Sequence, residues 1–209
     1  MIATQNSLIA TMVPNTRINP LVRDVAMVVV GVALLVISAQ FKVLLGPVPV
    51  TLQALVVMLI GGVYGWRMGG LTVAAYVLQG AALGAIAPAM PWFATPNFPG
   101  YAFVGATTGY LWGFVVAAAA IGFMSDTLRM RDNLITLFIA MMVGNVIITA
   151  LGLTFAMAVY YPILQQTGQS FSTVWGWFAQ PFIIGDTLKA VIATGLVFAG
   201  SAFVNRIRG

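Results

Sequence analysis

The chain alternates between long apolar stretches and short breaks that are rich in Pro, Gly or basic residues. Roughly 20 helical residues cross the hydrocarbon core of a bilayer, so an apolar stretch of about that length predicts a transmembrane helix. Six stretches meet this condition: 21–41, 50–66, 68–87, 105–124, 134–160 and 178–204. The sequence therefore predicts an all-α integral membrane protein with six transmembrane helices at 21–209, preceded by a tail at 1–20.

The composition agrees with a membrane protein, because 61% of the residues are hydrophobic and only 6% are charged. A soluble domain carries roughly 25% charged residues. The tail is polar and is interrupted by Pro14 and Pro20, so we expect no cleavable signal peptide.

The residue types that are missing exclude several kinds of chemistry. The sequence contains no His, Cys or Glu and no P-loop motif. Disulfides, zinc sites, Ser-His or Cys-His catalysis and ATP hydrolysis of the P-loop type therefore cannot be built from this chain. We expect no catalytic residues, no metal and no cofactor, and we favour a binding protein or a conduit over an enzyme.

The basic residues predict the orientation in the membrane, because Lys and Arg in short loops remain on the cytoplasmic side. They occur at the N-terminus, between the second and third stretches, between the fourth and fifth, and after the sixth. These residues are Arg17, Arg23, Arg67, Arg129, Arg131, Arg206 and Arg208. The opposite loops carry Lys42 alone, so both termini are predicted to be cytoplasmic. The net charge of +5 thus indicates topology and not a nucleic acid partner.

Asp186 and Lys189 are the candidate functional charges, because they interrupt the apolar run of the last predicted helix. Residues three apart on a helix share a face, so the two side chains can pair or hold one ligand together. A charge near the bilayer centre costs about 2.5 to 3.5 kcal/mol, which favours a functional interpretation. The alternative is an inert pair that clamps helices together.

The depth of this pair follows from its distance to the basic C-terminal end. Lys189 precedes Arg206 by 17 positions, which corresponds to about 25 Å along a helix. The pair is therefore predicted in the outer half of the membrane. Gln40, Lys42 and Gln53 border the same side, so the polar groups converge on an outward-facing pocket and not on a continuous pore.

Two outer segments have unusual sequences. The prolines of 46–53 favour extended backbone and cannot continue a helix. The segment 88–103 contains four prolines, several aromatic residues and Asn97. It is either an ordinary outer loop with interfacial aromatic residues or a lid that folds back over the bundle. The segment 162–169 is polar and predicts a solvent-exposed loop.

Small residues recur every four positions in two predicted helices, at Gly80 and Gly84 and along the run of Gly105, Gly109, Gly113 and Ala117. Such spacing lets helix backbones approach closely inside a membrane. The expected role is packing, and the alternative is a smooth face along which a helix slides.

Four segments together resemble the BioY family: Ser38–Gln40, Gly46–Gln53, Gly105–Phe114 and Pro181–Lys189. The resemblance extends from about Leu21 to the C-terminus. Members of this family are biotin-binding S components of energy-coupling factor (ECF) transporters. The family's Gly-Pro-Thr-Gly-Gly-Tyr pattern is altered here to Gly-Ala-Thr-Thr-Gly-Tyr at 105–110, and no strict Ala-x-x-x-Ala occurs in the first stretch.

The resemblance implies an S-component-like bundle in the cell membrane that captures biotin from outside. It implies as partners a transmembrane T component and ATP-binding cassette subunits, whose ATP cycle topples the S component. In the family, the Asp and Lys of the Gly-Asp-x-x-Lys motif belong to the biotin site, and these match Asp186 and Lys189. An Asn before the fourth helix does so too, and ungapped alignment from Gly105 gives Asn97.

The chemistry of biotin suits these residues. Its ureido ring offers two N–H donors and a carbonyl acceptor, which match a carboxylate and an ammonium; alternatively, Lys189 neutralises the valerate carboxylate. We prefer the first arrangement, with Asn97 or Gln53 assisting and with Phe93, Trp92 and Tyr110 covering the rings. Two other hypotheses remain: an S component for another vitamin, and a non-binding membrane assembly subunit.

Overall fold

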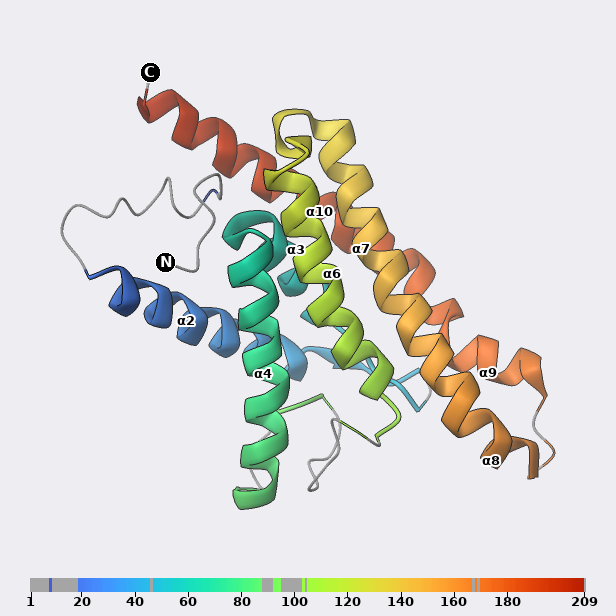
Figure 1. The fold of residues 1–209 in the computed structure, drawn as a ribbon. Helices are drawn as coiled ribbons and strands as arrows, with labels where there is room; N and C mark the ends of the chain where they lie inside the picture. Colours follow the sequence, from blue (N-terminus) through green and yellow to red (C-terminus); the bar gives the residue numbers. More distant parts are fainter. Residues whose placement is uncertain are drawn as a thin grey trace.

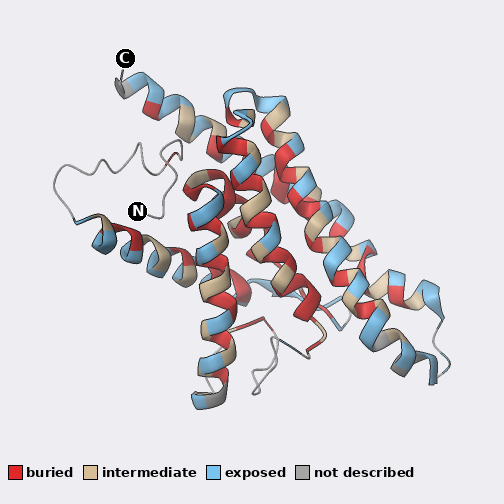
Figure 2. Ribbon diagram, viewed as in Figure 1, coloured by how far each residue is buried: buried red, intermediate tan, exposed pale blue. Residues whose placement is uncertain are grey.

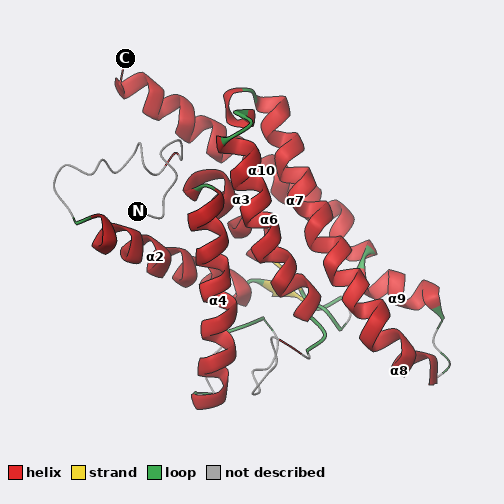
Figure 3. Ribbon diagram, viewed as in Figure 1, coloured by secondary structure: helices red, strands yellow, loops and turns green. Residues whose placement is uncertain are grey.

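The computed structural model describes residues 8, 19–45, 47–87, 92–94, 103, 105–166, 168 and 170–208, and its ordered elements are mostly helices (Figures 1 and 3). The first helices are α2 (Pro20–Gln40), α3 (Gln53–Tyr64), α4 (Trp66–Ile86) and α6 (Thr108–Asp126). They are followed by the short 3-10 helix η1 (Met130–Asp132), α7 (Leu134–Phe155), the π-helical turn η2 (Ala156–Tyr160), α8 (Tyr161–Gln166), α9 (Phe171–Phe178) and α10 (Gln180–Arg208). A small antiparallel hairpin pairs β1 (Lys42–Val43) with β2 (Val50–Thr51).

The helix ends follow from local sequence signals. Asn19 and Asn133 cap α2 and α7, because each side-chain oxygen accepts a hydrogen bond from a backbone N–H of the first turn. Gly65 separates α3 from α4 with a φ of 79°, a conformation that glycine adopts without steric cost. The turn therefore lies at Gly65, and Arg67 belongs to the first turn of α4.

Helix α6 is the central element of the bundle and packs against α3, α4 and α7 (Figures 1 and 2). Its small residues make this possible. A Cβ added to Gly109 would meet the carbonyl of Leu151 at 2.4 Å, and one added to Gly113 would meet the backbone of Ile148 at 3.1 Å. The predicted small-residue stripe is thus the contact between α6 and α7, in agreement with a packing role.

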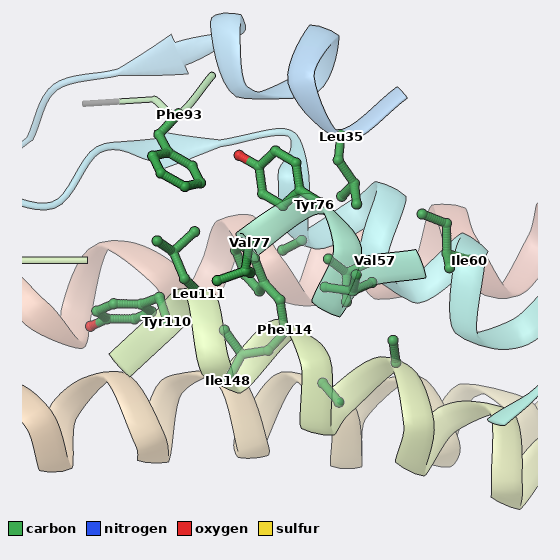
Figure 4. Packing of buried hydrophobic residues seen from close by; sticks show 14 of the residues in the cluster. Leu35, Val57, Ile60, Tyr76, Val77, Phe93, Tyr110, Leu111, Phe114 and Ile148 are labelled. Carbon is green, nitrogen blue, oxygen red and sulfur yellow. The ribbon is translucent and has the colours of Figure 1, made fainter. Parts of the chain in front are cut away.

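The buried apolar residues form two clusters. The larger one lies between α3, α4 and α6 and extends to the segment at Phe93, as the close view in Figure 4 shows. The smaller one joins α3, the middle of α7 and the second half of α10 through residues such as Met58, Met141 and Val197. Together they hold the beginning of α10 against the beginning of α6.

The outer surfaces of several helices are apolar, as lipid contact requires. Large exposed hydrophobic residues line α2, for example Val22, Val29 and Leu34. Within the described part of the chain, four helical segments are long and apolar enough to span a bilayer: Pro20–Gln40, Thr108–Asp126, Leu134–Val159 and Phe171–Arg206. The apolar helix α3 is shorter, with 12 residues. These features are those of a multi-pass membrane protein.

Each predicted stretch contains one helix, but several boundaries differ from the prediction. The second helix begins at Gln53 and not at 50, because Val50 and Thr51 pair with β1. The fifth helix continues as far as Gln166, so the exposed loop predicted at 162–169 is largely helical, although Gln165, Gln166 and Gly168 are exposed. The π-helical turn directly precedes Pro162, and such local adjustments accommodate a proline, which lacks an N–H. The last helix is preceded by α9 and is longer than predicted.

Candidate ligand pocket at the α10 ion pair

Asp186 and Lys189 form an ion pair inside the protein. The Lys189 Nζ lies 2.5 Å from the Asp186 Oδ1, and the two residues expose only 8% and 2% of their surfaces. They lie one helical turn apart on α10, as the spacing predicted. A buried ion pair of this kind adds little stability compared with apolar packing. Its role therefore has to be inferred from the groups around it.

A pocket opens next to this ion pair. It contains about 460 Å³ of space free of protein atoms, part of it open to solvent. The wall is mainly apolar and carries a few polar groups. The lining residues are Val48, Pro49, Thr51, Gln53, Ala54, Phe93, Ala94, Thr107, Tyr110, Leu111, Phe114, Ile148, Phe182, Asp186 and Lys189.

The junction of α9 and α10 orients the start of α10 toward the pocket. The helix is broken at Ala179, and Pro181 follows in the first turn of α10, where its missing N–H costs nothing. Because the Phe182 N–H bonds to the Ala179 carbonyl, the Phe178 carbonyl accepts its hydrogen bond from the Tyr110 hydroxyl instead. The Tyr110 and Phe182 rings lie 5.2 Å apart, centroid to centroid, on the pocket wall.

Glycine makes room for the Tyr110 ring. A Cβ at Gly152 of α7 would lie 2.3 Å from this ring, which no side chain tolerates. The position of Tyr110 therefore depends on α7 as well as on α6.

The β1–β2 hairpin forms another wall, with Lys42 opposite Thr51 and Val43 opposite Val50. The extended backbone predicted from the prolines of 46–53 is present in the described residues, since Val50 and Thr51 form a strand. The Thr51 Oγ1 accepts a hydrogen bond from the Gln53 N–H at 3.1 Å. The hairpin thus leads directly into α3 and places Gln53 at the pocket.

The described residues 92–94 cover the same region. Phe93 is 3% exposed and sits against Gly80, where an added Cβ would lie 2.4 Å from its ring. The Lys42 Nζ donates to the Ala94 carbonyl at 2.5 Å, which ties this segment to the hairpin. Residues 92–94 therefore pack onto the bundle, as the lid alternative expects, while most of the segment 88–103 lies outside the described residues.

A second, more open crevice of about 770 Å³ lies between the end of α2 and the hairpin. Its walls include Gln40, Lys42 and Thr51, and Lys189 borders both this crevice and the pocket. Lys189 therefore lies between the pocket and this crevice.

Five of the six predicted site residues line one pocket: Asp186, Lys189, Gln53, Tyr110 and Phe93. Asn97 lies outside the described residues. Trp92, which was predicted to cover a ligand, donates its indole N–H to the Ala87 carbonyl and is absent from the pocket wall as described. The sequence analysis missed Thr51 and Thr107 on the wall, although both belong to the motifs that carried the resemblance.

Metal binding has no support in the part of the chain that the structure describes, where no group of three His, Cys, Asp or Glu side chains gathers. The chemistry of the pocket is that of a recess with one carboxylate, one ammonium, an amide, hydroxyls and several aromatic rings. Such a set suits an uncharged or singly charged ring compound with both donors and acceptors.

The fold is similar to that of a solved structure described as the S-component for biotin from an ECF-type ABC transporter. The TM-score is 0.67 and the sequence identity 22%, covering 85% of this chain and 90% of that one. The family model of the BioY family matches residues 6–206. The chain belongs to the BioY family.

Curated relatives support this assignment. The biotin transporter BioY of Thermotoga maritima is 35% identical over 163 residues, which is 77% of this chain and 85% of that protein. The biotin transporter BioY of Rhodobacter capsulatus is 37% identical over 153 residues, or 72% of this chain and 76% of that protein.

Proposed function

We propose that this protein captures biotin from outside the cell in the pocket beside Asp186 and Lys189 and serves as the S component of an ECF-type transporter. The observation that carries the proposal is the buried ion pair on the wall of a mainly apolar recess. Two relatives that are at least 35% identical are named biotin transporters. Because a charge pair inside an apolar wall is a weak stabiliser, a polar ligand that completes it gives a reason for its presence.

In the proposed complex, the ureido ring of biotin lies against the ion pair. The Asp186 carboxylate accepts from a ureido N–H, since an ionised carboxylate retains free lone pairs after pairing with Lys189. The Lys189 ammonium, which has three donors, gives one to the ureido carbonyl. Each such charge-assisted bond contributes about 1.5 to 3 kcal/mol in an apolar site.

The remaining contacts complete the proposed site. Phe93 and Tyr110 cover the bicyclic ring, and Gln53 and Asn97 supply further hydrogen bonds. The alternative arrangement places the valerate carboxylate on Lys189, which also borders the outer crevice. A biotin methyl ester distinguishes the two arrangements. It retains affinity within about tenfold if Lys189 donates to the ureido carbonyl, and it loses a charge-assisted bond if Lys189 binds the carboxylate.

The proposed topology has six membrane crossings in the inner membrane, with both termini and the tail 1–20 in the cytoplasm. Figure 1 supports it, because the α3–α4 turn, the α6–α7 loop and the end of α10 lie at one end of the bundle and the hairpin at the other. The first of these ends carries Arg67, Arg129 and Arg206, as expected for cytoplasmic loops. The pocket would then face outward.

The proposed partners are a transmembrane T component and ATP-binding cassette ATPases. The sequence has no P-loop motif with which to hydrolyse ATP itself. We therefore infer a transporter subunit and not an enzyme: the partners supply the energy that topples the bundle, and lipid contacts its apolar outer faces. No nucleic acid takes part.

The decisive experiment is a biotin titration of the purified full chain and of Lys189→Ala. The variant removes the ammonium that donates to the ligand, so affinity should fall by about 1.5 to 3 kcal/mol, a factor of about 10 to 150. Arg206→Ala, which removes one positive charge from the exposed end of the same helix, should bind like the wild type. Wild-type affinity in Lys189→Ala would refute the assigned site.

The identity of the ligand is tested separately. Mass spectrometry of small molecules carried through purification should find biotin, and unlabelled thiamin or riboflavin should not displace labelled biotin. A wild-type protein that binds another vitamin, or nothing, would overturn the proposed function itself.

A further inference from the structure

Tyr76 is a fully buried residue of α4 that links the pocket to the segment covering it. Its surface is 0% exposed, and its side chain does not belong to the pocket wall. Its hydroxyl accepts a hydrogen bond from the Gln53 Nε2 at 2.6 Å and donates one to the Trp92 carbonyl at 3.1 Å. One buried oxygen thus joins the first residue of α3 to the start of the segment Trp92–Ala94.

The direction of these bonds fixes the Gln53 amide. A tyrosine hydroxyl has a single proton, and the Trp92 carbonyl is purely an acceptor, so the proton of Tyr76 points to Trp92. The neighbouring group of Gln53 must then be its NH₂. The Gln53 Oε1 faces the other way and accepts from the Thr51 hydroxyl at 3.3 Å. The backbone carbonyl of residue 92 therefore dictates which ends of the amide are offered to the pocket.

The aromatic ring of Tyr76 also contacts the segment Trp92–Ala94. The ring of Phe93 meets it edge to face, with a centroid distance of 5.5 Å and an interplanar angle of 88° (Figure 4). Phe93 in turn occupies the space that Gly80 leaves on the same helix. The segment is therefore held by Tyr76 from inside the bundle and by Lys42 from the hairpin.

We propose that Tyr76 is a positioning residue that sets how long the ligand stays bound, because its hydroxyl holds Trp92–Ala94 over the pocket and orients the Gln53 amide. This inference rests on the proposed function where biotin is concerned. Tyr76 touches no ligand itself. Loss of its hydroxyl leaves the Trp92 carbonyl without this donor and frees the Gln53 amide to rotate.

The experiment uses the absence of native cysteine. In an Ala94→Cys background the full chain has one thiol, placed in the covering segment at a residue that is 7% exposed. Its reaction rate with a maleimide, measured without ligand, reports how often the segment opens. Adding Tyr76→Phe should raise this rate about tenfold, since one buried oxygen loses two hydrogen bonds.

Tyr64→Phe is the matched control, because it also removes a buried tyrosine hydroxyl that donates to a backbone carbonyl. Tyr64 is 7% exposed, and its hydroxyl bonds to the Met27 carbonyl at 3.2 Å, away from the pocket wall. In the same Ala94→Cys background it should leave the labelling rate unchanged. Equal rates in Tyr76→Phe and Tyr64→Phe would overturn the proposal.

The second readout is the dissociation rate of bound biotin in the chain without the added cysteine. Tyr76→Phe should release biotin about tenfold faster, with a smaller change in the association rate, and Tyr64→Phe should match the wild type. An unchanged dissociation rate in Tyr76→Phe would contradict the inference. A wild-type chain that binds no biotin would instead refute the proposed function, while the labelling result would still decide the role of Tyr76.

Discussion

Two of the three buried ion pairs among the described residues occupy opposite ends of the bundle and differ in what surrounds them. Asp186 and Lys189 lie on one helix and face the pocket. Asp126, the last residue of α6, pairs with Arg131 of η1, and both residues are at least nine-tenths buried. In each pair, a carboxylate with 2% side-chain exposure meets a cation.

The difference lies in how the remaining hydrogen-bonding capacity is used. The Arg131 guanidinium also donates to the Gly62 carbonyl at 2.7 Å, so it joins the end of α3 to the α6–α7 connection. The Lys189 ammonium has further donors and borders both the pocket and the outer crevice. The Arg131 cation binds a carboxylate and a backbone carbonyl of the protein, whereas Lys189 lines the pocket.

A buried charge therefore does not by itself indicate a function, since both pairs are buried and only Asp186 and Lys189 line the pocket. Removing one partner from either pair leaves an uncompensated charge and should be costly in both cases. Variants of the two pairs should differ in biotin affinity and not in whether they lose stability, so the two quantities have to be measured independently. For Lys189→Ala we expect the loss in affinity described above.

Arg131→Met should have the largest effect on stability. It takes the opposite charge away from the buried Asp126 carboxylate and a donor away from the Gly62 carbonyl, so the free energy of unfolding should fall by about 3 to 5 kcal/mol. The affinity of the folded fraction for biotin should remain within about twofold, because Arg131 lies at the other end of the bundle. Thermal unfolding in detergent and titration of the folded fraction measure the two quantities.

Arg131→Lys controls for the charge, since it keeps the cation but loses the planar fork. It should destabilise the protein less than Arg131→Met does. If Arg131→Met lost as much biotin affinity as Lys189→Ala, the two ends of the bundle would be coupled and the contrast between the pairs would be wrong.

Replacing both partners should have a smaller effect on stability and sharpen the contrast. Asp126→Leu with Arg131→Met, and Asp186→Leu with Lys189→Met, should each recover stability to within about 1 to 2 kcal/mol of the wild type, because apolar side chains of similar volume need no compensation. Only the first double variant should bind biotin. Unfolding curves and titrations of both proteins, set against the four single variants, provide the test.

Biotin binding by the Asp186→Leu, Lys189→Met protein would contradict the assignment of the pocket pair. Loss of binding by the Asp126→Leu, Arg131→Met protein would show that the second pair also serves the ligand.

Local sequence patterns were sufficient to find helices α2, α3, α4, α6, α7 and α10 and the pocket charges. Asp186 and Lys189 are conspicuous because they interrupt an apolar run, and the prolines near Val50 predict extended backbone. The pairing of β1 with β2 and the position of residues 92–94 over the pocket depend on contacts between distant segments, which a local pattern does not encode.

The roles of Arg131 and Tyr76 could not be predicted from the sequence. The sequence analysis counted Arg131 only as a marker of topology, because a basic residue at a helix end has the same pattern whether it reaches solvent or pairs inside. Tyr76 lies in an apolar run where an aromatic residue predicts only packing. Its two hydrogen bonds become visible only once α3 and the segment at Trp92 are placed beside it.

The neighbouring pair Arg129–Asp132 is exposed, and removing it should have the smallest effect on stability. It has the same charges and a 2.9 Å contact, but its side chains are 81% and 57% exposed. Water and salt screen such a pair, so Asp132→Asn should change the free energy of unfolding by less than about 0.5 kcal/mol. Unfolding midpoints at low and high salt provide the measurement. Since Asp132 lies next to Arg131 in sequence, an effect as large as that of Arg131→Met would mean that position in the loop, and not burial, determines what an ion pair contributes here.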